Sequence, residues 1–262
     1  MKIEIRELND TYCKFVVDGV HPYFVNALRR VLLSEVPKLA IDKVIFYDNT
    51  SALFDEMIAH RIGLLPVPTD PSTLNLKGQV DAEGKPVYVV RFTLTKEGPC
   101  TVYSGDLECE DKKFSIVDPR VPIVELLKDQ RLILEAEASL GEGTQHARWQ
   151  VCSAVGYKYY PTATADNRKI KPEQAKAAVE RSPAGILALE GGKIQVLQAE
   201  EVNRADEAEK LTEGAFKIDY DDRKFIFRFE TDGSLKAADA LMKALDLLKG
   251  RFKAFSDAAA EL

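Results

Sequence analysis

The residues able to carry metal or redox chemistry are few in this 262-residue sequence. It holds four cysteines, at positions 13, 100, 109 and 152, and three histidines. Zinc sites are built from close ligand pairs such as Cys-x2-Cys, and no such pair occurs. Only His146 lies near a cysteine, six residues before Cys152. We therefore expect no metal site, and we interpret the cysteines as mostly reduced, mostly buried thiols.

Two cysteines lie close enough in sequence to raise the question of a disulfide. Cys100 and Cys109 flank the segment PCTVYSGDLEC, which is typical of a hairpin that turns at Ser104-Gly105. The two thiols could face each other across such a hairpin. Disulfides are rare in the cytosol outside hyperthermophiles, which favours free thiols here.

Three patterns resemble catalytic motifs but lack essential parts. Glu56 and His60 would share one face of a helix expected over 54–62, yet the second histidine of an HExxH motif is missing. Gly191-Gly192-Lys193 lacks the first glycine and the final Ser/Thr of a phosphate-binding loop. No GxSxG elbow is present. We expect no catalytic residues in the chain.

Polar side chains on an otherwise apolar helix suggest binding rather than catalysis. The segment FVNALRRVLLSEVP predicts a helix over residues 23–36, after Pro22 and before Pro37. Its apolar face consists of Phe24, Ala27, Leu28, Val31 and Leu32. Asn26, Arg29 and Arg30 lie in its middle. Arginine can make paired hydrogen bonds at an interface, or it can extend its head to solvent.

The last helix, expected over 234–256 with Ser234 as its N-cap, carries a regular apolar seam. The spacing of 3, 4, 3, 4 and 3 residues is the period by which helices pack along each other. The seam consists of Ala238, Leu241, Leu245, Leu248, Phe252 and Phe255. Gly250 costs about 1 kcal/mol inside a helix, and a close neighbouring backbone would justify it. Two apolar terminal helices from each of two chains would form a four-helix core, so we predict a dimer.

The segments between these helices are rich in strand patterns. Residues 165–215 differ, because they are rich in Ala, Glu and Lys and indicate a separate small module. We expect a hairpin over 216–231 that turns at Asp221-Asp222. The other expected strands are 2–7, 13–18, 39–47, 87–95, 131–140 and 149–160.

Composition and charge limit the classes of function that fit this chain. The net charge is −6 and the pI is about 5.3. Because phosphate contacts need a basic surface, the chain is a poor candidate for binding DNA by itself. No apolar run approaches the roughly 18–20 residues that span a membrane. The N-terminus MKIEIRELND lacks a signal-peptide core, and we expect a cytoplasmic protein.

Two segments carry a family resemblance. FVNALRRVLLSEVPKLAIDKVIFYDNTS (24–51) resembles the assembly helix of the alpha-like family of RNA polymerase subunits, and EMIAHRIGLLPV (56–67) resembles that family's A-H-R-(I/L)-G-L-(L/I)-P segment. The order of the remaining segments is similar to the archaeal, D-type branch. The resemblance implies an α+β fold with a discontinuous alpha-like dimerisation domain (1–45 and 219–262). It also implies an inserted strand-rich domain (46–164) and a ferredoxin-like module (165–218).

In that branch the module often resembles a bacterial ferredoxin, in which Cys-x2-Cys-x2-Cys-x3-Cys-Pro runs hold iron–sulfur clusters. Two runs here keep the spacing, but none of the eight positions is a cysteine. The positions are Pro172, Ala175, Ala178, Ser182, Val202, Ala205, Ala208 and Thr212. Because a cluster needs thiolate ligands, we expect a degenerate module that has no iron–sulfur cluster and no other cofactor.

The resemblance implies a non-catalytic assembly subunit of a DNA-directed RNA polymerase. It implies that the two terminal apolar faces bind a small L-type subunit, and that the Asn26, Arg29 and Arg30 edge meets a large catalytic subunit. Small zinc-bearing subunits, N and P, are also implied as partners. Two alternatives remain: a ferredoxin-related electron-transfer protein, against which the missing cysteines argue, and a free-standing homodimeric binding protein.

Overall fold

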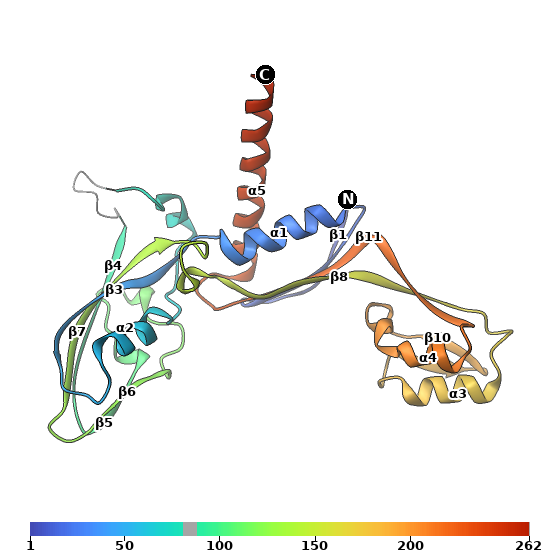
Figure 1. Cartoon of the computed structure of the whole chain (residues 1–262), viewed down its shortest axis with the longest axis horizontal. Helices are drawn as coiled ribbons and strands as arrows, with labels where there is room; N and C mark the ends of the chain where they lie inside the picture. Colours follow the sequence, from blue (N-terminus) through green and yellow to red (C-terminus); the bar gives the residue numbers. More distant parts are fainter. Residues whose placement is uncertain (81–87, 262) are drawn as a thin grey trace. The chain divides into compact units, whose positions relative to one another are not determined.

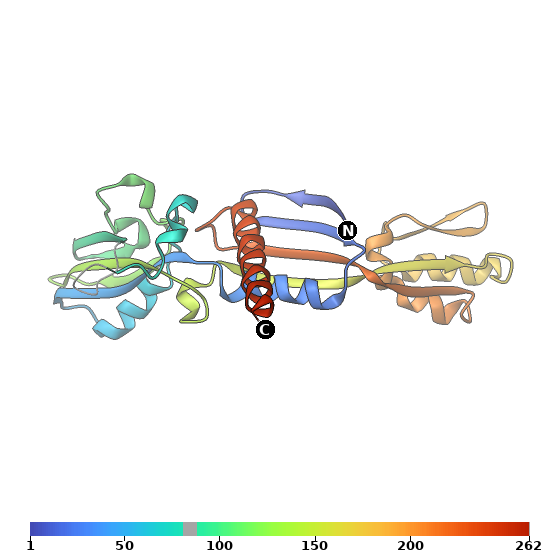
Figure 2. The same cartoon turned by 90° about the horizontal axis from the view of Figure 1, so that it is seen from above.

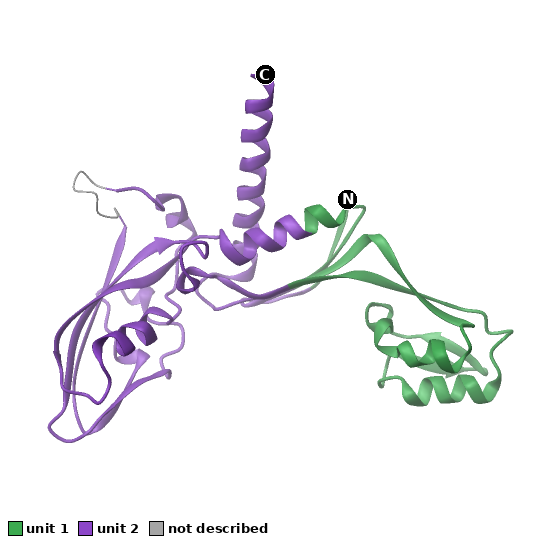
Figure 3. Ribbon diagram, viewed as in Figure 1, with its two compact units in different colours: residues 1–6, 14–25, 156–227 green, residues 7–13, 26–155, 228–262 purple. Residues whose placement is uncertain are grey.

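The computed structural model describes residues 1–80 and 88–261. The chain has a mixed α+β fold, as predicted, with antiparallel strand pairs and helices. It divides into two compact units, coloured separately in Figure 3. Unit 1 contains residues 1–6, 14–25 and 156–227, and unit 2 contains residues 7–13, 26–155 and 228–262. Each unit is therefore assembled from segments that are distant in the sequence.

Unit 1 contains most of a four-stranded sheet (Figure 2). Its order is β1-β2-β11-β8, and the strands are β1 (Lys2–Leu8), β2 (Tyr12–Asp18), β11 (Phe216–Thr231) and β8 (Cys152–Ala165). Aromatic rings pack along it: Phe15 stacks on Phe227 at 5.1 Å between ring centroids, and Tyr157 meets Phe225 edge-on at 5.9 Å. Ring pairs of this kind add to the stability gained by burying the surface alone.

The predicted hairpin over 216–231 is wrong, because β11 runs through Asp221-Asp222 as one strand. Asp221 accepts a hydrogen bond from the Arg223 N–H at 2.8 Å, which is a local contact that does not reverse the chain. Phe216 and Phe225, on either side of it, are each fully buried. Burial of the strand on both sides of the two aspartates therefore outweighs their local turn preference.

A second core within unit 1 lies in the Ala-, Glu- and Lys-rich segment. Its elements are α3 (Pro172–Arg181), β9 (Leu187–Glu190), β10 (Lys193–Val196), a 3-10 helix (Ala199–Ala205) and α4 (Asp206–Leu211). β9 and β10 pair antiparallel, joined by Gly191 and Gly192 with positive φ values of 57° and 78°. The Gly-Gly-Lys sequence is therefore a hairpin turn that needs glycine.

Unit 2 is built around a three-stranded antiparallel sheet in the order β3-β7-β4 (Figure 1). Its strands are β3 (Lys38–Asn49), β7 (Arg131–Gly141) and β4 (Val89–Glu97), with helix α2 (Asp55–Gly63) and the β5 (Cys100–Tyr103) and β6 (Pro122–Leu126) pair beside it. The alternation predicted for residues 131–140 is confirmed. Leu132, Leu134, Ala136 and Ala138 all point into the core.

The terminal helices are α1 (Pro22–Ser34) and α5 (Ala237–Ala260). Helix α1 begins at Pro22, one residue before its predicted start, and ends at Ser34, two residues before its predicted end. Helix α5 begins three residues later than the predicted N-cap at Ser234. The reason is that the Ser234 N–H and hydroxyl both donate to Asp232 Oδ1, at 3.0 Å and 2.5 Å, which holds Ser234 in a turn before the helix.

All four thiols are free. The hairpin expected between Cys100 and Cys109 does not form, because β5 pairs with β6 and a 3-10 helix (Ser104–Asp106) follows it. Cys13 and Cys152 are buried, whereas Cys100 and Cys109 are half-buried. Burial raises the pKa of the Cys13 thiol. Burial, reinforced by Asp232, raises the pKa of Cys152 to about 12.

These environments predict selective alkylation. Because only the thiolate reacts, iodoacetamide near neutral pH is expected to modify Cys100 and Cys109 and to spare Cys13 and Cys152. Peptide mass mapping of the native protein measures the labelled fraction, and labelling in denaturant, where all four should react, is the control. Native labelling of Cys152 as fast as Cys109 would contradict the buried environment.

Candidate assembly surface

Helix α1 has one face that the chain itself covers and one that it leaves partly open. Of the predicted interface residues on this helix, Leu28, Val31 and Leu32 are 1–4% exposed, whereas Phe24 and Ala27 are half-buried. The first three therefore belong to the core of the isolated chain. A second polypeptide could reach the half-buried pair without any change in the helix.

The polar residues in the middle of α1 have two different environments. The Arg29 guanidinium donates two hydrogen bonds to Asn26 Oδ1, from Nε at 3.2 Å and from Nη2 at 3.1 Å, so these two side chains are fixed to each other one turn apart. Arg30 is exposed, and its guanidinium forms no hydrogen bond or ion pair with another described residue. Arg30 is therefore the cation on this helix that is available to a partner.

Helix α5 changes character along its length. Its first half is anchored by the buried Ala237, Ala240, Ala244 and Leu248, with Leu241 and Leu245 half-buried. Every described residue from Lys249 onward is exposed. Figure 3 shows this second half projecting away from the rest of unit 2. The predicted seam is thus covered by the chain only in its middle, from the half-buried Leu241 to the buried Leu248, whereas Ala238 before it and Phe252 and Phe255 after it are exposed.

The bare end carries two large aromatic side chains. Phe252 is 61% exposed and Phe255 is 74% exposed. Apart from its own turn of helix, a Cβ at Gly250 would meet no atom of the described chain within 4 Å. Burying a phenylalanine is worth about 1.5–3 kcal/mol, and an isolated helix of a few turns is marginal in water. This segment therefore gains most of its stability only when something covers it.

One ion pair joins the two terminal helices. Arg251 of α5 binds Glu35, the residue after α1, through both guanidinium ends: Nη1 lies 2.9 Å from Oε1, and Nη2 contacts Oε2. The two residues are 216 positions apart in the sequence. Such a paired geometry fixes the direction between the partners, although the exposed arginine limits its contribution to stability.

The base of α5 is held by polar contacts to three other segments. The Lys38 ammonium, 3% exposed at the start of β3, binds Asp232 just after β11. The Ala237 N–H donates to the Asp10 carbonyl at 2.8 Å, and the Thr69 N–H donates to the Ser234 carbonyl at 2.8 Å. Three separate segments of unit 2 therefore fix where the helix starts.

Sequence reasoning missed a second exposed apolar surface, on α2. Phe54, Met57 and Leu64 are 78%, 54% and 49% exposed. Phe54 and Leu64 cap the two ends of the helix and Met57 lies in its first turn, whereas Ile58 and Ile62 between them are buried. All five apolar residues were visible in the sequence, but only the structure shows which of them are exposed and which are buried. Arg61 and Gly63 hold the helix to the sheet region: Arg61 donates to the Pro122 carbonyl at 2.6 Å, and Gly63 lies against the Ile41 carbonyl.

The positions with ferredoxin-like spacing converge on one core. Ala175, Ala178, Val202, Ala205 and Ala208 are 0–1% exposed and belong to the same apolar cluster. Thr212 is also buried; its hydroxyl donates to the Ala208 carbonyl at 2.7 Å and accepts from the Phe216 N–H at 3.0 Å. Pro172 is instead the exposed first residue of α3, and Ser182 is half-buried after its end. Six of the eight positions are therefore buried in the core of this segment.

Two further residues that were considered for chemistry lie on helix α2. Glu56 and His60 are both exposed on α2. Within residues 1–80 and 88–261, no group of three or more His, Cys, Asp or Glu side chains is arranged to hold a metal ion. None of the helices described in the chain is both long and apolar enough to cross a membrane.

The exposed apolar end of α5 and the partly open face of α1 are typical of a surface that binds another polypeptide. Residues 14–252 match the RNA polymerase Rpb3/Rpb11 dimerisation domain, and the chain belongs to that family. It is 39% identical over 257 residues to DNA-directed RNA polymerase subunit Rpo3 of Methanosarcina acetivorans, a match that covers 96% of this chain and 95% of that protein. It is 40% identical over 256 residues to subunit Rpo3 of Methanothermobacter thermautotrophicus, with 96% of each chain covered. The family resemblance seen in the sequence is therefore confirmed.

Proposed function

We propose that this protein is a non-catalytic assembly subunit of a DNA-directed RNA polymerase, which pairs with a small L-type subunit to form the platform for the large catalytic subunits. The bare half of α5 is the observation that carries the proposal. Phe252 and Phe255 are large apolar side chains that the free chain leaves exposed to solvent, and they continue a seam of period 3.5. In this proposal, polymerisation chemistry and contact with the DNA template belong to other subunits.

The dimer interface combines the two terminal helices. It uses Phe252 and Phe255 with the half-buried Leu241 and Leu245 on α5, and Phe24 and Ala27 on α1. Leu28, Val31, Leu32 and Leu248 support these residues from the core. The dimerisation domain is formed by residues 1–45 and 219–262, the inserted strand-rich domain by 46–164, and the module by 165–218.

The large subunit is proposed to bind at Asn26, Arg29 and Arg30. Arg30→Ala is expected to leave the heterodimer with the L-type subunit intact and to reduce capture of the large subunit about tenfold, because interface arginines often contribute more than 1 kcal/mol. Pull-down of the large subunit by the purified heterodimer measures this. The matched control is Arg120→Ala, at a side chain that is 90% exposed. Equal capture by both variants would contradict the assignment.

The exposed stripe on α2 offers a second contact for other polymerase subunits. Phe54, Met57 and Leu64 present apolar side chains to solvent, and contiguous patches of this kind mark interaction sites. The large subunits and the small zinc-bearing subunits N and P are the candidate partners for this stripe.

The 165–218 module is proposed to be a ferredoxin-like fold that has lost its cluster. Thiolate ligands are absent from all eight positions, and alanine and valine side chains fill the core there. Protein purified without oxygen is expected to contain far less than one iron or sulfide per chain, measured against a ferredoxin purified in parallel. Stoichiometric iron and sulfide would contradict this proposal.

Purification of the tagged chain from its native cells tests the function as a whole. A polymerase subunit is expected to bring down the two largest polymerase subunits together with a small alpha-like partner, identified by mass spectrometry. Recovery of the chain only as a pair of identical copies would instead support a free-standing homodimeric binding protein.

A further inference from the structure

The outer edge of β4 is only partly paired. In the sheet order β3-β7-β4, strand β4 bonds to β7 on one side and is the edge on the other. Among the residues that the structure describes, one bridge covers that edge: the Thr93 N–H donates to the Glu108 carbonyl at 2.8 Å, and the Glu108 N–H donates to the Thr93 carbonyl at 2.9 Å. Beyond Glu108 the chain turns into a 3-10 helix (Lys112–Phe114) and the pairing stops.

The bridge shows which backbone groups of β4 face outward. In an antiparallel strand, the N–H and C=O of one residue point to the same side, and this side alternates from residue to residue. The N–H and C=O of Thr93 point away from β7. The N–H and C=O of Arg91 and Val89 therefore point away from β7 as well. Their outward N–H and C=O groups have no backbone partner among the described residues. Phe92, by contrast, bonds toward Ala136 of β7.

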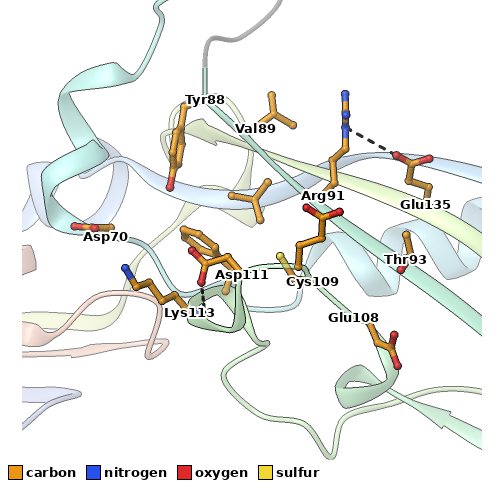
Figure 4. Close-up of a pocket in the computed structure, with 13 residues that line it drawn as sticks. Asp70, Tyr88, Val89, Arg91, Thr93, Glu108, Cys109, Asp111, Lys113 and Glu135 are labelled. Atoms are coloured by element: carbon orange, nitrogen blue, oxygen red, sulfur yellow. Dashed lines mark hydrogen bonds and ion pairs between the residues drawn. The ribbon is translucent and has the colours of Figure 1, made fainter.

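A groove of about 900 Å³ lies along this open edge (Figure 4). Val89, Arg91 and Thr93 form one wall, and the segment from Glu108 to Phe114 forms the other. Tyr88 and Phe114 meet edge-on at 6.5 Å between ring centroids and give the groove an aromatic surface. The groove therefore combines unpaired strand backbone with a place for an apolar side chain.

The lining is strongly acidic. Two cations, Arg91 and Lys113, face five carboxylates: Asp70, Glu108, Glu110, Asp111 and Glu135. Arg91 is already engaged, because its Nε lies 3.2 Å from Glu137 and 3.9 Å from Glu135. Within the described chain, Glu108 and Glu110 form no ion pair. The groove therefore has excess negative charge available to an occupant.

We propose that this groove binds an extended, basic segment of another polypeptide, which adds to β4 as an antiparallel strand opposite Val89 and Arg91. Backbone hydrogen bonds along a free strand edge give affinity to an extended peptide. The unpaired carboxylates select lysine or arginine, and the Tyr88–Phe114 rings select an apolar neighbour. The surface is separate from the α1 and α5 residues of the proposed heterodimer, so the inference does not rest on that pairing.

Edge pairing and charge can be tested separately with peptide probes. A dye-labelled peptide that alternates valine with lysine is expected to bind the full chain in fluorescence anisotropy, and to bind more weakly as salt is raised. The same peptide with glutamate in place of lysine is expected to bind at least tenfold more weakly. Equal binding of the two peptides, or failure of the lysine peptide to bind, would overturn the proposal.

A matched pair of variants tests the backbone role. Arg91→Pro removes the outward N–H but no ladder bond to β7, which an edge strand tolerates. Arg91→Ala removes the same side chain and keeps the N–H. We expect Arg91→Pro to bind the lysine peptide at least tenfold more weakly than Arg91→Ala. Equal affinities would overturn the strand-addition geometry.

Hydrogen exchange on the unmodified chain gives a readout that does not depend on a variant. The amides of Val89 and Arg91 are expected to exchange rapidly in the free protein and at least tenfold more slowly with the lysine peptide bound. The Phe92 amide, already bonded to β7, should be slow in both states. Peptide binding without added protection at Arg91 would contradict the proposal.

Discussion

Replacing both Phe252 and Phe255 by glutamate is expected to abolish the heterodimer with an L-type subunit. The two side chains are 61% and 74% exposed in the free chain, so the change costs little before association. At the proposed interface the change removes about 3–6 kcal/mol of binding free energy that comes from burying the two rings, and it introduces two buried charges. The dissociation constant is therefore expected to rise at least about a hundredfold. Analytical ultracentrifugation of the mixed chains measures it.

The control for this variant is Lys253→Glu, which changes the net charge by the same amount on the same exposed helix end, at a residue outside the seam. It is expected to dimerise like the unmodified chain. Circular dichroism of each free chain checks that α5 has not been lost. Equal affinities for the double variant and the control would place the interface elsewhere.

Asp232→Ala is expected to be the most destabilising single substitution near the helix base. It leaves the Lys38 ammonium, 3% exposed, without its carboxylate partner. An unpaired buried charge costs several kcal/mol. Because Asp232 is 27% exposed, solvent already weakens the pair, and we expect a loss at the low end of that range, roughly 3 kcal/mol in the free energy of unfolding. Trp149, the single tryptophan, is in unit 2, and its fluorescence during urea unfolding reports this loss.

Two variants separate the ion pair from the other contacts of Asp232. Ser234→Ala removes the hydroxyl bond to Asp232 but keeps the Lys38 pair, and it should cost about 1 kcal/mol. Lys38→Met combined with Asp232→Leu removes both charges and should recover most of the stability lost in Asp232→Ala. If Asp232→Ala costs no more than Ser234→Ala, the buried pair does not anchor the helix.

Strong periodicity made the terminal helices predictable, but not their surroundings. The seam of α5 and the stripe of α1 follow from spacing alone, because spacing decides which residues share a face. It does not decide what covers that face. Leu28 and Leu248 are therefore buried within the chain while Phe255, in the same pattern, is bare.

Features made by contacts between distant segments were outside the reach of sequence reasoning. The Arg251–Glu35 pair joins positions 216 residues apart, and the acidic groove draws its carboxylates from three segments of unit 2. The hairpin predicted over 216–231 failed for the same reason. A local turn signal at Asp221-Asp222 was outweighed by burial of Phe216 and Phe225, which no local pattern reports.

The most direct test of the assembly role is the mass of the particle formed when the chain is co-expressed with an L-type subunit. Light scattering during size exclusion is expected to give a one-to-one heterodimer, in which the α5 segment after Lys249 becomes protected from proteolysis. Two separately eluting proteins, with that segment still open to cleavage, would contradict the role proposed for the exposed helix.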